Sequence, residues 1–85
     1  MPKMVKNIIE KQEIDKWLSR IEGVHPRLSA GSEKGESILK NISAYISDSK
    51  HFLEEGDYVN SFEAVIWAWA WYEIGRDLGL VVEKS

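Results

Sequence analysis

The sequence predicts an all-α fold, an up-and-down bundle of three helices, and two observations support this prediction. Apolar residues recur three and four positions apart through most of the chain, which is the spacing of one face of an amphipathic helix. The pair Gly56-Asp57 separates the last two such stretches, and it suits the end of one helix and the start of the next. A chain of 85 residues has room for one domain (1–85), and the absence of cysteine leaves packing as its source of stability.

The first helix is expected over residues 3–22. Gly23 is expected to end it, because glycine favours the position after a helix. Its apolar stripe consists of Ile14, Trp17, Leu18 and Ile21. Further upstream, Val5, Ile8 and Ile9 project to the opposite side of the same ideal helix. The helix therefore either changes its packing partner there or bends.

Residues 23–32 are expected to form a linker, because Pro26 and the small residues from Ser29 to Ser32 suit neither helix nor strand periodicity. Ser32 is a suitable N-cap for a second helix, expected over residues 33–55. The apolar stripe of this helix consists of Ile38, Leu39, Ile42, Tyr45, Ile46, Ser49, Phe52 and Leu53. Polar and charged residues occupy the opposite side, so that side is expected to face water.

The third helix is expected over residues 58–78, followed by a short tail, 79–85. Within it, Val65 to Tyr72 alternates tryptophan with alanine, which is also compatible with a buried strand. A helix is favoured because residues 58–78 contain no proline and three alanines, and because Asp57 and Gly79 fit its two caps. Helices 33–55 and 58–78 are then joined by a tight hairpin at Gly56-Asp57.

The helix 58–78 is apolar over a wide arc, which predicts a neighbouring helix on each side. Its small residues line up along the centre of this arc, and they are Ser61, Ala64, Ala68 and Gly75. Larger apolar residues flank this line on both sides, so two helices can approach closely. A three-helix bundle requires this arrangement.

One line of the same helix combines apolar with acidic residues and is expected to face outward. Its apolar members are Ile66, Trp67, Ala70 and Ile74. They form a candidate interface, because a contiguous apolar surface usually marks a binding site. The acidic members, expected at the rim of a two-fold pair, are Glu63, Glu73 and Asp77. The alternative is that Val5, Ile8 and Ile9, or the tail residues 80–82, cover this line.

Charge and hydropathy limit the classes of partner. The formal net charge is −3, and acidic residues dominate the last third of the chain, which disfavours binding to nucleic acid. The longest strongly apolar run, residues 64–72, is far shorter than the ~20 residues that span a bilayer. The basic N-terminus leads into no signal-peptide core. We therefore expect a cytoplasmic protein that does not bind a membrane.

The second half of the chain contains three sequence elements in order, Tyr45-x-x-Asp48-x-x-x-Phe52, Gly56-Asp57-Tyr58-Val59 and Gly75-x-x-x-Gly79. Together they resemble the archaeal family known as domain of unknown function 357. The resemblance implies an up-and-down three-helix bundle of the albumin-binding-domain type and no established activity. The chain differs from the pattern at Ala70 and Glu73, where the resemblance leads us to expect glycine and aspartate, so a polar family site there is not expected.

Two groups of residues are candidates for site chemistry. Asp48, His51 and Glu55 share an outer face of helix 33–55 at a spacing that could bind a metal. A solvated face is favoured, since the helix 58–78 offers no inward carboxylate or histidine opposite them. Arg20 and His25 have the R-x4-H spacing that resembles the ribonuclease motif of the HEPN superfamily, but a single such pair is a weak signal. No catalytic, cofactor-binding or metal-binding residue is predicted.

The sequence thus predicts a non-enzymatic helical module that binds another protein or a second copy of itself, without a cofactor. We expect an unidentified protein partner or a homodimer formed through the candidate interface. The alternative is an accessory domain that binds nucleic acid or a small ligand, because exposed tryptophans can stack on bases or aromatic rings. Trp67 is the tryptophan expected nearest to solvent.

Overall fold

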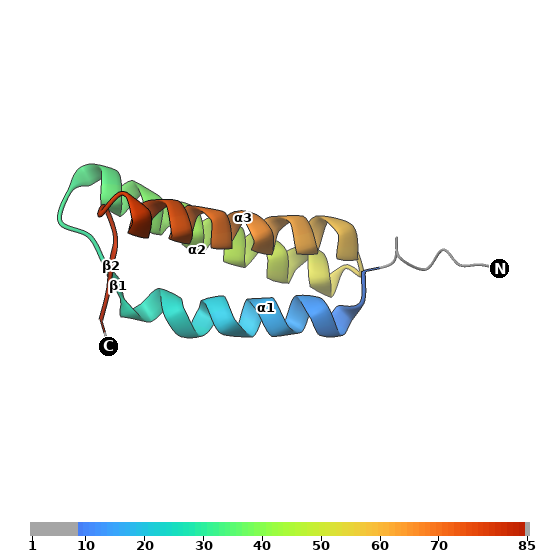
Figure 1. The fold of residues 1–85 in the computed structure, drawn as a ribbon. Helices are drawn as coiled ribbons and strands as arrows, with labels where there is room; N and C mark the ends of the chain where they lie inside the picture. Colours follow the sequence, from blue (N-terminus) through green and yellow to red (C-terminus); the bar gives the residue numbers. More distant parts are fainter. Residues whose placement is uncertain (1–8, 85) are drawn as a thin grey trace.

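The computed structural model describes residues 9–84, and most of them form three long helices that lie side by side (Figure 1). These helices are α1 (Lys11–Val24), α2 (Glu33–Glu54) and α3 (Tyr58–Asp77). A 3-10 turn, η2 (His25–Arg27), and two short strands, β1 (Leu28–Ser29) and β2 (Val82–Glu83), complete the elements. The start of α1 and the α2–α3 turn lie at one end of the molecule, and both strands lie at the other.

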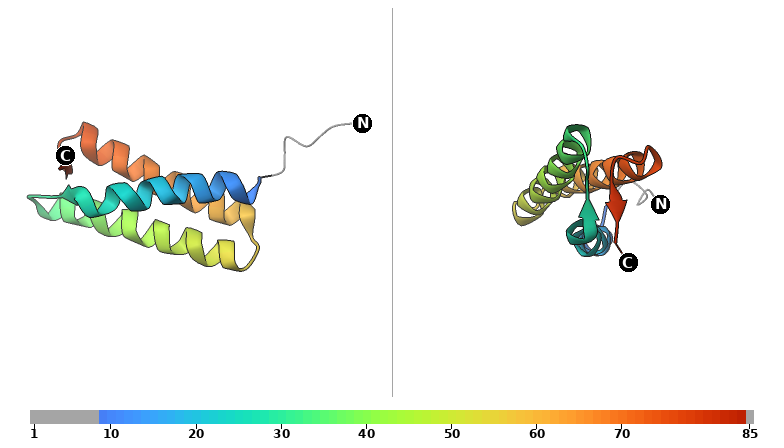
Figure 2. Two further views of the ribbon diagram at one scale, coloured as in Figure 1. Left: turned by 90° about the horizontal axis from the view of Figure 1, so that it is seen from below. Right: turned by 90° about the vertical axis from the view of Figure 1, so that its left-hand side faces the viewer.

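The core forms where the predicted apolar stripes meet. Seen along its length, the molecule has α1 lying against the pair formed by α2 and α3 (Figure 2). The buried core residues are Ile14, Leu18, Ile21, Ile38, Ile42, Ile46, Val65, Ala68, Tyr72 and Val81. The four small residues predicted to line the centre of the apolar arc of α3 are buried as well, and they are Ser61, Ala64, Ala68 and Gly75. The prediction of three helices packed as a bundle is confirmed.

The connection between α2 and α3 is the tight turn that the sequence predicts. Gly56 has a φ angle of 78°, a backbone conformation that residues other than glycine rarely adopt. The Asp57 carboxylate accepts a hydrogen bond from the Asn60 backbone N–H at 3.2 Å and so caps α3. Deeper in the hairpin, the Ser49 and Ser61 hydroxyls each donate to the other residue's carbonyl at 2.7 Å. These buried bonds fix how α2 and α3 sit along one another.

The expected bounds of the first helix are wrong at both ends. The predicted start at residue 3 fails, because Ile9 and Glu10 precede the helix and α1 begins at Lys11; residues 3–8, with Val5 and Ile8, lie outside the described part. Gly23 does not end the helix, since its φ angle is not positive and α1 runs on to Val24. The helix gives way to the 3-10 turn that contains Pro26. The other two helices each end one residue before the predicted bound, at Glu54 and Asp77.

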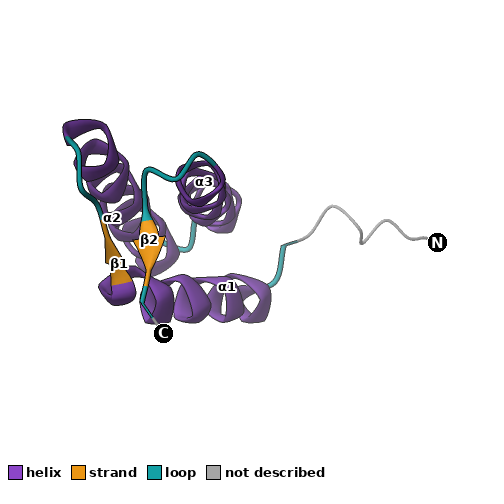
Figure 3. Cartoon of the chain, turned by 60° about the vertical axis from the view of Figure 1, so that its left-hand side comes forward, coloured by secondary structure: helices purple, strands orange, loops and turns teal. Residues whose placement is uncertain are grey.

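The predicted linker and tail need a correction, because they form an antiparallel pair of short strands beside the three helices (Figure 3). Leu28 of β1 pairs with Glu83 of β2, and Ser29 pairs with Val82. The tail returns to the bundle because Val81 enters the core, where it is 2% exposed. Strands of two residues carry no periodicity in the sequence, so nothing local predicts them.

Two glycines give the tail its place beside the helices. A Cβ atom at Gly35 in α2 would come within 2.3 Å of the Leu80 carbonyl oxygen. At Gly75 in α3, a Cβ atom would come within 2.9 Å of the Val81 side chain. Because both distances are shorter than atomic contact allows, only glycine lets the backbone approach this closely.

Candidate functional site

The four residues of the predicted interface lie on the outward side of α3, and we call them the α3 patch. Ile66, Trp67 and Ile74 are 45%, 48% and 44% exposed, and Ala70 is partly buried between them. The Trp67 ring stacks on Tyr45 of α2, with ring centroids 6.2 Å apart and an interplanar angle of 21°. The patch is therefore an exposed apolar surface in which the Trp67 ring is held in place by Tyr45. The tail does not cover the patch, because Leu80 and Val81 pack against the core.

A hollow of about 370 Å³ borders the α3 patch on the side of α1. Its lining includes Trp17 of α1 together with Trp69 and Glu73 of α3. The two indole rings meet edge to face, with centroids 5.9 Å apart. The Trp69 Nε1–H donates to the Trp17 carbonyl at 3.2 Å, so this ring cannot turn freely. The hollow thus has two fixed aromatic walls and one exposed carboxylate at its edge.

A second hollow, of about 310 Å³, borders the patch on the side of α2. Tyr45 and Trp67 form its aromatic wall, and Asp48 and Glu63 contribute carboxylates. Both of these acidic residues are exposed. The α3 patch therefore lies between two hollows that share one composition, an aromatic wall beside a carboxylate.

The predicted metal-candidate residues do not form a site. Asp48 lines the hollow beside Trp67, whereas His51 lines a different depression on the outer side of α2. The His51 Nε2 atom lies 3.4 Å from a Glu55 carboxylate oxygen, as an exposed pair one turn apart. Within residues 9–84, no three acidic, histidine or cysteine side chains gather as metal ligands would.

Arg20 and His25, the pair at R-x4-H spacing, have different neighbours. The Arg20 guanidinium lies over the Trp17 ring, 5.0 Å from its centroid. A ring nitrogen of His25 lies 3.4 Å from the Leu39 carbonyl oxygen. Neither contact aligns the two side chains for acid–base chemistry on a shared substrate.

A hollow of about 660 Å³ lies over the start of α2, and its charged lining residues are Glu33, Glu36 and Lys40. A helix start can bind anions through its free N–H groups. Here the Ser32 hydroxyl already accepts from the Gly35 N–H at 3.1 Å, and the two carboxylates repel an anion. The size of this hollow is therefore no indication of a phosphate site.

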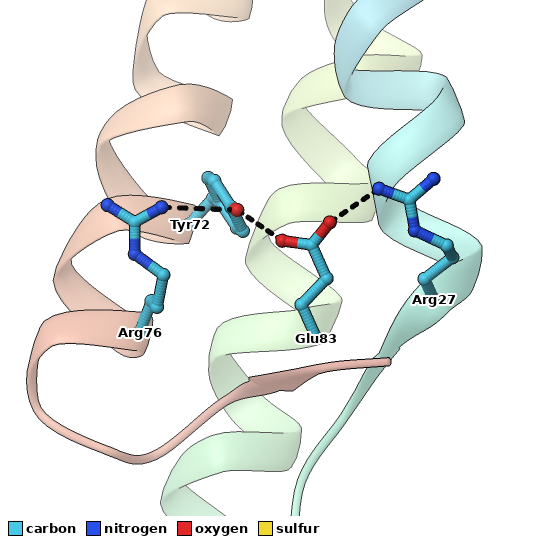
Figure 4. A network of polar contacts seen from close by, with 4 residues as sticks. All are labelled: Arg27, Tyr72, Arg76 and Glu83. Carbon is cyan, nitrogen blue, oxygen red and sulfur yellow. Dashed lines mark hydrogen bonds and ion pairs between the residues drawn. The ribbon is translucent and has the colours of Figure 1, made fainter. Parts of the chain in front are cut away.

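A polar cluster that sequence reasoning missed holds the tail against the helices (Figure 4). The Glu83 carboxylate accepts hydrogen bonds from the Tyr72 hydroxyl and the Arg27 guanidinium. Arg76 in turn donates to the Tyr72 oxygen at 3.3 Å. Nothing in the sequence signals this cluster, because its members come from η2, α3 and β2, which only the fold brings together.

The chemistry of this cluster is structural. The bond from Tyr72 and the neighbouring Arg27 lower the pKa of Glu83, so the carboxylate is held in its charged form. The same bond to Glu83, together with burial, raises the pKa of Tyr72. A tyrosine that keeps its proton more tightly than usual is a poor nucleophile and a poor base. The cluster therefore works as a clasp between the tail and the bundle.

Among residues 9–84, no helix has the length and apolar character needed to cross a membrane.

Comparison with known proteins supports the three-helix fold. A solved structure from Archaeoglobus fulgidus is similar to this chain, with a TM-score of 0.79 and 48% sequence identity over 86% of this chain and 91% of that one. It is described as belonging to family DUF357. None of the curated proteins matches the chain.

The family model for DUF357, described as a protein of unknown function, matches residues 12–81. This range covers nearly all of α1 as well as the second half of the chain, which contains the three sequence elements that resemble the family. The family match and the description of the similar solved structure both name DUF357. The chain therefore belongs to the DUF357 family.

Proposed function

We propose that this chain is a non-enzymatic helical module that binds another protein through the α3 patch. The observation that supports the proposal is the concentration of Ile66, Trp67 and Ile74, each close to half exposed, on one side of one helix. Contiguous apolar surface of this kind is costly in water unless a partner covers it. Aromatic residues such as Trp67 are also typical anchors of protein interfaces.

A second copy of the chain is one partner that would cover the patch, giving a homodimer. Two-fold pairing places the same helix face against itself, which is the commonest arrangement in small homo-oligomers. An unidentified protein with a complementary face is the other partner. Both fit an interaction module, and both require the same residues of α3.

The competing function, an accessory domain for nucleic acid or a small ligand, has less support. The outward side of α3 carries Glu63, Glu73 and Asp77, and carboxylates repel a phosphate backbone. A small aromatic ligand would have to bind in the α1–α3 hollow, whose edge carries Glu73. The patch itself extends beyond that hollow, which favours a partner as broad as a helix.

Replacing Ile66 with arginine tests the proposed function. Ile66→Arg puts a charge on the patch at an exposed residue outside the core, so the helical content by circular dichroism is expected to stay the same. Proteins retained by the full chain from native cytosol, or its own association at hundreds of micromolar, are expected to be lost. Val82→Arg, at an exposed apolar residue of β2, is the matched control and should lose neither.

The same two variants can also contradict the proposed function. If light scattering shows a monomer at hundreds of micromolar, and if the unmodified chain and Ile66→Arg retain the same proteins, the α3 patch is no interface. A loss shared equally by Ile66→Arg and Val82→Arg would contradict the proposal as well, because it would not depend on the patch.

A further inference from the structure

The charges that α3 places beside its patch are acidic, whereas α1 contributes two cations, Lys16 and Arg20, which lie 5.1 and 5.0 Å from the centroid of the Trp17 ring. The charged residues of α3 are Glu63, Glu73, Arg76 and Asp77. The one cation among them is engaged, since Arg76 donates to the Tyr72 hydroxyl at 3.3 Å and lies 3.8 Å from Asp77. Within residues 9–84, Glu63 and Glu73 form no ion pair. Asp48 adds a further carboxylate on the α2 side.

These carboxylates stand at both long edges of the patch. Glu73 is at the edge of the α1–α3 hollow, beside Trp17 and Trp69. Glu63 and Asp48 are at the edge of the α2–α3 hollow, beside Trp67. An aromatic wall next to a carboxylate suits a lysine or arginine side chain, whose alkyl stem packs on the ring while its charge meets the acid.

This pattern disfavours a second copy as the occupant. Pairing two α3 patches face to face brings the carboxylates of one copy toward those of the other. Each chain also carries a formal net charge of −3. Like charges brought together at an interface cost free energy, whereas opposite charges steer partners together and fix how they align.

We propose that the partner of the α3 patch is a basic amphipathic helix, with an apolar stripe bordered by lysine or arginine on both sides. This inference rests on the proposed function and names the chemistry of the partner. The patch from Ile66 to Ile74 is about 12 Å long, or two helical turns, so it accepts apolar residues spaced i, i+4 and i+7. The flanking cations then meet Glu73 on one edge and Glu63 with Asp48 on the other.

Three synthetic helices of about five turns test the inference against the full chain. All three have the same leucine stripe, and their flanking residues are lysine, glutamine or glutamate. The lysine helix is expected to bind at least about tenfold more tightly than the glutamate helix in titration calorimetry. Its affinity should fall as salt rises, and its binding should shift the amide resonances of α3.

Charge-reversal variants make the test specific to the patch. Glu73→Lys is expected to lower the affinity of the chain for the lysine helix and to raise its affinity for the glutamate helix. Glu54→Lys changes the net charge equally at an exposed residue on the outer side of α2, so it is the matched control. It should leave the preference between the two helices almost unchanged. Equal effects of the two variants would mean that the overall charge of the chain, and not the α3 patch, sets the preference for the lysine helix.

Other results overturn the inference and separate it from the proposed function. If the three helices bind equally and Ile66→Arg abolishes all binding, the patch is an interface but its partner is not selected by charge. Self-association that Ile66→Arg abolishes would identify a second copy as the occupant. A shift of α3 resonances in the free chain on Lys3→Glu with Lys6→Glu would identify its own N-terminal residues. If no helix binds and no resonance of α3 shifts, the basic partner is wrong, and the cytosol experiment alone decides the function.

Discussion

Two turns of the molecule have the same backbone geometry and lead to different structures. Gly56 after α2 has a φ angle of 78°, and Gly79 after α3 has a φ angle of 74°. At each turn, the N–H groups of the glycine and of the next residue donate to carbonyls of the last helical turn, which is the Schellman arrangement. After the first turn a new helix begins, whereas after the second the chain crosses the bundle and forms β2.

The residues that follow each glycine explain the difference. The Asp57 carboxylate accepts a hydrogen bond from the Asn60 backbone N–H and caps α3, so a helix starts at once. Leu80 and Val81 have no capping group but are apolar, and they bury themselves against the helices. A shared turn therefore fixes where a helix ends, and the next two residues decide what the chain does afterwards.

The largest effect on stability is expected from adding one methyl group where the tail crosses α2. Gly35→Ala places a methyl group within 2.3 Å of the Leu80 carbonyl oxygen, so the tail has to shift. We expect a loss of about 2 kcal/mol in the free energy of unfolding, the range of overpacked sites. Chemical denaturation measures this loss. Faster hydrogen exchange at the Lys84 N–H, which donates to the Arg27 carbonyl, would locate it at the strands.

The same substitution at Gly23 is the control, because a Cβ atom there meets nothing within 4 Å. Gly23 lies inside α1, where alanine is favoured over glycine by up to about 1 kcal/mol. Gly23→Ala is therefore expected to stabilise the protein. Similar small gains from both substitutions would show that the tail does not press against α2.

The hairpin could be predicted from the sequence, and the clasp could not, for a physical reason. The signals for the first turn, Gly56 and Asp57, are adjacent and act on their own backbone. The clasp depends on Arg27, Tyr72 and Glu83, which are far apart in the chain and meet only after the helices pack. The α3 patch is intermediate. Helical periodicity placed Ile66, Trp67 and Ile74 on an outward line, but the hollows beside them depend on tryptophan orientations that periodicity does not fix.

A matched pair of valine substitutions tests whether the two turns are equivalent. Both glycines have open space around the Cβ position, so Gly56→Val and Gly79→Val differ from the native protein mainly in backbone strain. Each is expected to lower the free energy of unfolding by about 1–2 kcal/mol, because a left-handed φ angle is costly for a branched residue. Thermal and denaturant melts of the two variants measure this.

Asparagine sharpens that comparison, since it tolerates the left-handed conformation better than valine does. Gly56→Asn and Gly79→Asn should each recover part of the stability that valine loses. A valine variant that melts like the native protein would show that its turn is not under the expected strain. A large loss at Gly79 alone would mean that the clasp, and not the turn, is the sensitive feature.

The smallest effect concerns pH and belongs to the clasp alone. Hydrogen bonds from Tyr72 and Arg27 lower the pKa of Glu83 below its ordinary value of 4.5. A carboxyl whose pKa is lower in the folded state stabilises the fold above its unfolded pKa, and the stabilisation is lost as the pH falls through the folded value. The native protein should therefore melt at a higher temperature than Glu83→Gln at neutral pH, and the two should converge in acid below 4.5.

Tyr72→Phe separates the two partners of Glu83 in the same experiment. Because the tyrosine bond is the largest single cause of the lowered pKa, its removal should reduce the pH dependence and leave the part due to Arg27 and Arg76. The lost neutral-pH bond is expected to cost about 0.5–1.5 kcal/mol. A gap between the native protein and Glu83→Gln that stays constant from neutral to acid pH would mean that Glu83 holds the tail by packing. In that case the second Schellman turn leads into β2 through the burial of Val81 alone, without the charge of the clasp.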